Sequence, residues 1–210
     1  MKSGNWLVNR FTLLLRRFMQ PIQNIFPILS QPKNVVITMH QKPDGDAMGS
    51  TLGLYHFLNK LGYSCTVISP TNWASFLNWM PGCKQVIDYE SQPAKADGLI
   101  NEADWIFCLD FNILSRTKRM EEKLSKAPGL RILIDHHQEP QVEMFAYGIS
   151  DVEKSSTAEM VYDFIVASGH ADIIDATIGE CLYAGVMTDT GSFRFPSAKA
   201  SVHKMLYELK

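Results

Sequence analysis

The chain has 210 residues, 46% of them hydrophobic and 20% charged, with a formal net charge of −2 at pH 7. This length and apolar content suffice for one well-filled core, and the balanced charge disfavours sequence-independent binding to long duplex nucleic acid, which needs an excess of Lys and Arg. No stretch approaches the roughly 18 consecutive apolar residues of a membrane-spanning helix, so we expect no transmembrane segment.

Residues 1–32 carry the pattern of an amino-terminal amphipathic helical extension. Apolar residues recur at helical spacing with basic residues among them, namely Leu7, Phe11, Leu14, Phe18 and Ile25 with Lys2, Arg10, Arg16 and Arg17. Such a helix can pack on its own domain, pack on a partner subunit in a homodimer, or rest on an anionic membrane surface. We favour packing on protein, where amphipathic helices most often bury their apolar stripe. No small-residue cleavage site follows Arg16-Arg17, so a signal peptide is not expected.

From residue 33 onwards, short apolar runs alternate with helical patterns. Strands are expected at 35–39, 65–69, 86–88, 104–109 and 130–134, and helices at 47–61, 118–126, 157–167 and 172–187, with a last helical segment after 197. A capping box, Ser156-Thr157-Ala158-Glu159, marks the start of the helix at 157. The alternation predicts an α/β domain over 33–196, with a mostly parallel sheet flanked by helices on both faces.

Acidic residues and histidines follow the ends of these predicted elements. They are His40, Asp44 and Asp46 after the strand at 35–39, Asp110 after 104–109, the triplet Asp135-His136-His137 after 130–134, and Asp189 just past the helix at 172–187. Ligands of open parallel sheets bind beyond the carboxyl ends of the strands, so we expect these side chains to converge there. The sequence therefore predicts a two-metal hydrolytic site at this edge of the sheet.

The types of residue narrow the choice of metal. Carboxylates crowded in a low-dielectric cleft repel one another unless divalent cations compensate them. Imidazole and carboxylate ligands without a nearby thiolate suit manganese, iron, zinc or cobalt, whereas magnesium prefers oxygen ligands. We expect two divalent metal ions, with Mn²⁺ as the first choice. The four cysteines form no Cys-x-x-Cys pair and are expected as packed thiols in a reducing, cytoplasmic compartment, namely Cys65, Cys83, Cys108 and Cys181.

The order and the sequences of these motifs resemble those of the DHH phosphoesterase family. The pattern runs His40-x-x-x-Asp44-x-Asp46, then Asp110, then Asp135-His136-His137, then the segment 185–191, Gly-Val-Met-Thr-Asp-Thr-Gly. The resemblance covers roughly residues 35–195. The amino-acid sequences of segments 42–50 and 188–195 most resemble the bacterial branch that degrades very short oligoribonucleotides and dephosphorylates 3′-phosphoadenosine 5′-phosphate.

The resemblance implies a role for each motif residue. One metal would be held by His40, Asp44 and Asp110 and the other by Asp46, Asp110, His136 and Asp189, which makes Asp110 the bridging, catalytic carboxylate. His137 would face the substrate phosphate or the leaving group, and Asp135 would orient a neighbouring ligand. Beyond these motifs, Arg194 could hold a substrate phosphate by a bidentate contact or could be a solvated arginine.

The implied activity is hydrolysis of short oligoribonucleotides, nucleoside 3′,5′-bisphosphates, or both, by metal-activated water. An inorganic pyrophosphatase or polyphosphatase is an alternative enzyme, since its first lobe resembles this one. A non-catalytic nucleotide-binding module is the alternative from another class. Family members usually continue into a second lobe with a glycine-rich, histidine-containing motif that this sequence lacks, so we expect 197–210 to begin a helical linker to a carboxyl-terminal lobe absent from this chain.

One aromatic segment has two interpretations. Trp73, Phe76, Leu77 and Trp79 precede Met80-Pro81-Gly82. The rings could stack on a base, but we favour burial of this segment as a cluster at a helical turn.

Overall fold

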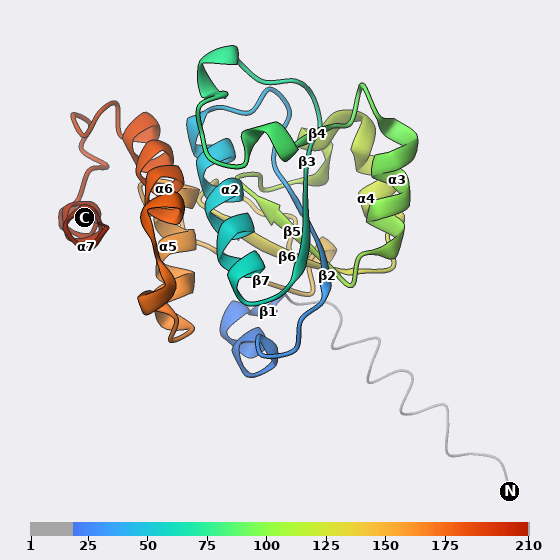
Figure 1. Ribbon diagram of the computed structural model, residues 1–210, viewed down its shortest axis with the longest axis horizontal. Helices are drawn as coiled ribbons and strands as arrows, with labels where there is room; N and C mark the ends of the chain where they lie inside the picture. Colours follow the sequence, from blue (N-terminus) through green and yellow to red (C-terminus); the bar gives the residue numbers. More distant parts are fainter. Residues whose placement is uncertain (1–18, 210) are drawn as a thin grey trace, which may run out of the picture.

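The computed structural model describes residues 19–209, and a seven-stranded sheet runs through the middle of this part of the chain (Figure 1). Its strands are β1 (Gln20–Pro21), β2 (Asn34–Thr38), β3 (Ser64–Ser69), β4 (Ile87–Asp88), β5 (Trp105–Leu109), β6 (Leu130–Asp135) and β7 (Tyr147–Ser150). All neighbouring pairs are parallel, in the order β1-β7-β6-β5-β2-β3-β4. The predicted parallel α/β sheet is confirmed.

Helices cover both faces of the sheet, as predicted. The α-helices are α2 (Gly45–Lys60), α3 (Pro93–Glu102), α4 (Glu121–Lys126), α5 (Thr157–Ala167), α6 (Ala176–Asp189) and α7 (Ala200–Glu208). Short 3₁₀ helices lie in the connections, namely η1 (Ile22–Ile28), η2 (Ser75–Leu77), η3 (Cys83–Gln85), η4 (Leu114–Met120), η5 (Val142–Met144) and η6 (Ala171–Ile173). Figure 1 shows α2, α5 and α6 on one face and α3 and α4 on the other.

Successive residues of the central strands enter opposite cores. Phe107 belongs to the core shared with α2, α5 and α6, whereas its neighbours Ile106 and Cys108 belong to the core beneath α3 and α4. Because both faces are covered, most positions of the central strands are apolar. This explains why they stand out in the sequence as nearly continuous apolar runs.

The order of the strands creates a crevice at one point of the sheet. The chain passes from β2 to β3 and β4 on one side, then returns to β5, β6 and β7 on the other side. Side chains beyond the carboxyl ends of two strands that diverge in this way line a natural binding crevice. His40 follows β2 and Asp110 follows β5, so both residues flank this point.

Residues 20–29 are part of the packed domain, although they were expected in the extension 1–32. Strand β1 pairs with β7, and Ile22, Ile25 and Leu29 are buried in the core. Pro27 lies inside η1, and a proline disfavours a regular α-helix at this point. The amphipathic helix expected over residues 1–18 lies outside the described residues.

Two local expectations need correction. The helix expected at 118–126 begins only at Glu121, because the backbone of Lys118 has a φ of 54° and interrupts it. Burial of the aromatic segment is wrong for Phe76 and Trp79, which are 70% and 59% exposed, although Leu77 is buried. The single turn of η2 presents only one side to the core, so its other side faces outward.

The carboxyl-terminal segment packs on the domain through α7. Val202 and Met205 are buried, and the Tyr162 hydroxyl donates a hydrogen bond to Glu208. The linker role expected for 197–210 stays a prediction.

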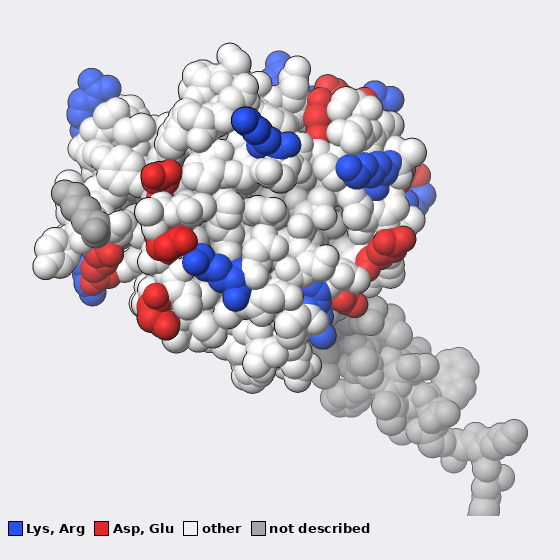
Figure 2. All heavy atoms as spheres, in the orientation of Figure 1, with Lys and Arg blue, Asp and Glu red and all other residues white. Residues whose placement is uncertain are grey.

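The surface carries mixed charge. On the face drawn in Figure 2, Lys and Arg side chains are scattered among Asp and Glu, and the described residues form no large basic patch there. Within residues 19–209, none of the helices combines the length and the apolar character needed to span a bilayer.

Candidate metal centre

The first group of site residues lies where β2 meets α2. Asp44 is the N-cap of α2, and its Oδ1 accepts hydrogen bonds from the amides of Asp46 (3.1 Å) and Ala47 (3.0 Å). Gly45 is the first residue of the helix, and Lys42 before it adopts the left-handed conformation with a φ of 49°. The helix start thus fixes the two carboxylates relative to each other.

Asp110 joins the two halves of the site. Its side chain is 3% exposed, and its backbone has a φ of 63°, which is uncommon for a non-glycine residue. Oδ2 lies 3.4 Å from His40 Nε2, whereas Oδ1 lies 3.5 Å from His136 Nε2. His40 Nε2 also lies 3.9 Å from Asp44 Oδ2. The two oxygens of one carboxylate therefore face two different groups of potential ligands.

The second group comes from three separate elements. His136 follows β6, Asp46 lies in the first turn of α2, and Asp189 is the last residue of α6 rather than the residue just past it. His136 Nε2 lies 3.4 Å from Asp189 Oδ2 and 3.9 Å from Asp46 Oδ2. The structure thus brings together all six residues expected as metal ligands, in triads formed by His40, Asp44 and Asp110 and by Asp46, His136 and Asp189.

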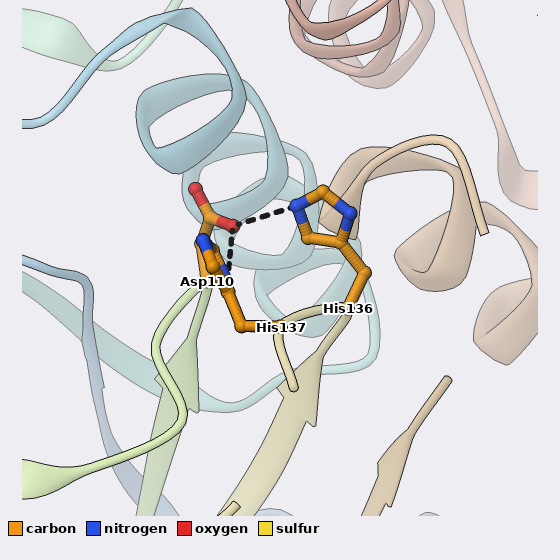
Figure 3. A group of neighbouring side chains, drawn as sticks. All are labelled: Asp110, His136 and His137. Carbon is orange, nitrogen blue, oxygen red and sulfur yellow. Dashed lines mark ion pairs between the residues drawn. The ribbon is translucent and has the colours of Figure 1, made fainter. Parts of the chain in front are cut away.

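His137 stands beside this cluster with Asp135 behind it. Its Nδ1 lies 2.7 Å from Oδ1 of the fully buried Asp135 and 3.7 Å from Asp110 Oδ1. Figure 3 shows His136 and His137 approaching the same oxygen of Asp110 from two sides. Asp110, His136 and His137 therefore form a third triad with metal-ligand spacing.

Burial and neighbouring charge shift the pKa values of these groups. Burial of Asp46, with the charges of Asp110 and Asp189, raises its pKa well above the ordinary value. Burial and Asp110 also raise the pKa of Asp189 to about 6. For Asp110, burial acts to raise the pKa, but contacts with His136 and His40 hold it far below its usual range. Burial acts to lower the pKa of both histidines, yet their contacts with Asp110 raise it.

The donor set fits divalent cations. Four carboxylates belong to the cluster, namely Asp44, Asp46, Asp110 and Asp189. Among the described residues, every ion pair to them comes from a histidine, so no Lys or Arg compensates their charge. His40 Nδ1 lies 2.7 Å from the Gln41 carbonyl, which can only accept, so Nε2 is left to present its lone pair to the site. Imidazole nitrogens and carboxylate oxygens without a thiolate suit Mn²⁺ and its neighbours in the first transition row.

Thr157 belongs to the site although the sequence analysis assigned it only to a capping box. Its amide donates to Asp46 Oδ2 (2.7 Å) and its hydroxyl to Asp110 Oδ1 (3.0 Å). The capping box itself is present in modified form, since Ser156 Oγ accepts from the Glu159 amide but Glu159 accepts from the Ser155 amide. The motif could locate the start of the helix but not the carboxylates that it faces.

Arg116 is a second residue that sequence reasoning missed. Its Nη1 donates to the carbonyl oxygen of Asp110 (3.3 Å), and its own carbonyl accepts from the Gln41 amide (2.9 Å). Arg194, expected at the substrate, is exposed and donates from Nε to the Gly191 carbonyl (2.8 Å). Its contact with a substrate phosphate stays a prediction.

Comparison with known proteins gives one family and several relatives. The model of the DHH family, N-terminal domain, matches residues 34–186. The bifunctional oligoribonuclease and PAP phosphatase NrnA of Thermus thermophilus is 32% identical over 176 residues, which cover 83% of this chain and 49% of the relative. The protein of the same name from Bacillus subtilis is 23% identical over 178 residues, 83% of this chain and 52% of the relative. The chain thus spans about half the length of these curated relatives.

Solved structures share the fold. An exopolyphosphatase-related protein from Bacteroides fragilis has a TM-score of 0.85 and 41% identity, covering 89% of this chain and 55% of that protein. The exonuclease RecJ bound to manganese has a TM-score of 0.57 at 15% identity, covering 90% of this chain and 47% of RecJ, and shows similarity of fold alone.

Proposed function

This chain belongs to the DHH family, and from that premise we propose that it is a two-metal phosphoesterase for short oligoribonucleotides, nucleoside 3′,5′-bisphosphates, or both. The observation that carries the proposal is the division of the Asp110 carboxylate, whose Oδ2 faces His40 and whose Oδ1 faces His136. A buried carboxylate that faces one triad with each oxygen is suited to bridge two cations. Sites with two cations about 3.5–4 Å apart are a recurring design for phosphoryl hydrolysis.

We assign the six clustered residues to two ions, Mn²⁺ in the first instance. His40, Asp44 and Asp110 would hold one ion, and Asp46, Asp110, His136 and Asp189 the other. When bound, the pair of ions would supply an activated water and neutralise charge on the phosphoryl oxygens. The raised pKa values of Asp46 and Asp189 support this assignment, because crowded carboxylates ionise fully only when a cation compensates them.

The protein's own groups would position the substrate and move a proton. The Asp135 carboxylate holds His137 through Nδ1, so that the ring presents Nε2 to a phosphate or a leaving oxygen. A histidine in this arrangement can donate a proton to the departing group. Arg194 would add a charged contact to a substrate phosphate from the segment after α6.

The proposed substrates rest on the names of the curated relatives and on the chemistry of the clustered residues. The curated relatives are called oligoribonuclease and PAP phosphatase, which supports short nucleotides with a terminal phosphate. The exopolyphosphatase-related protein is the specific observation that favours a second candidate, hydrolysis of pyrophosphate or polyphosphate. A nucleotide-binding module without turnover is the third.

A single set of assays separates these candidates. The purified chain with Mn²⁺ is given a diadenylate, 3′-phosphoadenosine 5′-phosphate, pyrophosphate, and bis-p-nitrophenyl phosphate, an activated ester that needs few remote contacts. We expect release of AMP or phosphate from the first two substrates, with loss of activity in Asp110→Asn and in EDTA. Turnover of pyrophosphate alone would favour the second candidate. Nucleotide binding without turnover of any ester would contradict the enzyme.

A further inference from the structure

Thr157 touches two of the clustered carboxylates at once. It is the first residue of α5 and has no exposed surface. Its amide donates to Asp46 Oδ2 at 2.7 Å, and its hydroxyl donates to Asp110 Oδ1 at 3.0 Å. One side chain and its own backbone therefore connect a carboxylate of α2 with the carboxylate that follows β5.

The contact is asymmetric at Asp110. The hydroxyl reaches Oδ1, the oxygen that lies 3.5 Å from His136 Nε2. The other oxygen, Oδ2, lies 3.4 Å from His40 Nε2, and the hydrogen bond from Thr157 goes to Oδ1 instead. Both carboxylates held by Thr157 thus face His136, since Asp46 Oδ2 is also near its Nε2 (3.9 Å).

The start of helix α5 fixes the position of the Thr157 hydroxyl. Helix α5 begins with Ser156 as N-cap, whose Oγ accepts from the Glu159 amide (3.1 Å), and Glu159 in turn accepts from the Ser155 amide (2.8 Å). A β-branched side chain at a fixed helix start has few rotamers. The amide of Ala158 adds a second bond to Asp46 Oδ1 (2.9 Å).

We propose that Thr157 is a positioning residue for the metal site on the His136 side. This inference rests on the proposed two-metal function. The hydroxyl fixes the rotation of the Asp110 carboxylate so that Oδ1 points toward His136, while the amide holds Asp46. Hydrogen-bond partners that orient ligands in this way typically change metal affinity 10–100-fold when they are removed.

The test is a titration of the metal-free chain with Mn²⁺, monitored by calorimetry and by electron paramagnetic resonance. We expect the two ions to bind in two separate steps. Thr157→Val keeps the shape of the side chain and the amide but removes the hydroxyl, and we expect it to weaken one of the two binding steps 10–100-fold. Thr157→Ser keeps the hydroxyl and should restore the wild-type affinity. In the His136→Ala background, which removes the site in question, Thr157→Val should change the remaining affinity less than about twofold.

A matched control addresses folding. Thr51 is also fully buried, and its hydroxyl donates to the Ala47 carbonyl within α2 rather than to a carboxylate of the site. Thr51→Val should leave both Mn²⁺ steps unchanged, whatever it does to the melting temperature in EDTA. Equal weakening of both steps in Thr157→Val, or no weakening of either, would overturn the positioning role. If the wild-type chain binds no Mn²⁺, the proposed function itself fails, which is a different result.

Discussion

Gly49 and Gly185 meet backbone to backbone, so that a Cβ atom added to Gly49 would stand 2.8 Å from the amide nitrogen of Gly185. Gly49 lies in α2, one turn after Asp46, and Gly185 lies in α6, one turn before Asp189. The approach of these two glycines therefore sets how closely both carboxylates converge on His136.

Gly49→Ala should lower the stability of the protein. The added methyl group must displace α6, and such overpacking typically costs about 1–3 kcal/mol. Urea unfolding followed by circular dichroism measures the loss. The matched control is Gly98→Ala in α3, where an added Cβ meets nothing within 4 Å and where we expect a gain of about 0.5–1 kcal/mol from helix propensity. Equal stability of Gly49→Ala and the wild type would show that the helices separate at no cost.

Asp189→Asn should stabilise the metal-free protein at neutral and alkaline pH. The folded state raises the pKa of Asp189 to about 6, so its contribution to stability is present below its ordinary pKa and is lost as pH rises through about 6. Asparagine cannot ionise and avoids that loss. We expect a melting temperature in EDTA that is a few degrees higher at pH 8 and unchanged near pH 3.5. The exposed Asp172→Asn serves as the control, and a lower melting temperature for Asp189→Asn at pH 8 would contradict this account.

Asp110→Asn and His40→Ala should differ in the number of Mn²⁺ ions lost. If Asp110 serves both ions, its amide variant should weaken both, whereas His40→Ala should remove one and leave the other. Elemental analysis after loading and gel filtration measures the stoichiometry. His170→Ala is the control, because that histidine follows the carboxyl end of α5, contacts Ser168 and Phe57, and belongs to none of the candidate metal triads. If Asp110→Asn bound as many Mn²⁺ ions as the wild type, Asp110 would not bridge the two ions.

His137→Ala should slow turnover without loss of metal. Loss of a general acid typically lowers kcat by roughly 10²–10⁴. Steady-state kinetics on the diadenylate and metal analysis of the same sample separate chemistry from binding, and His136→Ala is the comparison that should lose an ion. Since His137 also lies in a triad with Asp110 and His136, loss of an ion from His137→Ala would reassign it as a ligand.

The sequence was most informative where a predicted metal ligand directly follows a strand. The apolar runs ending at Met39, Leu109 and Ile134 are unambiguous because both faces of the sheet are covered, and the ligands stand at their ends. By contrast, β7 contains Gly148 and α3 contains Gly98, so neither shows a clean apolar pattern. Strand β7 is defined by its pairing with β6, and α3 by its packing on the core beneath it.

Contacts across long stretches of sequence could not be predicted. The hydroxyl of Thr157 reaches Asp110 from 47 positions away, and no local pattern encodes that distance. The exposure of Phe76 and Trp79 was missed for a related reason, since an aromatic cluster looks the same in sequence whether its rings face inward or outward.

The left-handed backbone of Asp110 also limits which residues suit this position of the chain. Aspartate and asparagine are among the few non-glycine residues that readily adopt a positive φ, and of these two only aspartate carries a charge. Glutamate would keep the carboxylate but not the backbone preference, and glycine would keep the backbone but not the carboxylate. Exchange of aspartate for glutamate should therefore strain the backbone at this position as well as lengthen the side chain. Aspartate at position 110 thus satisfies a geometric and a chemical requirement at the same time.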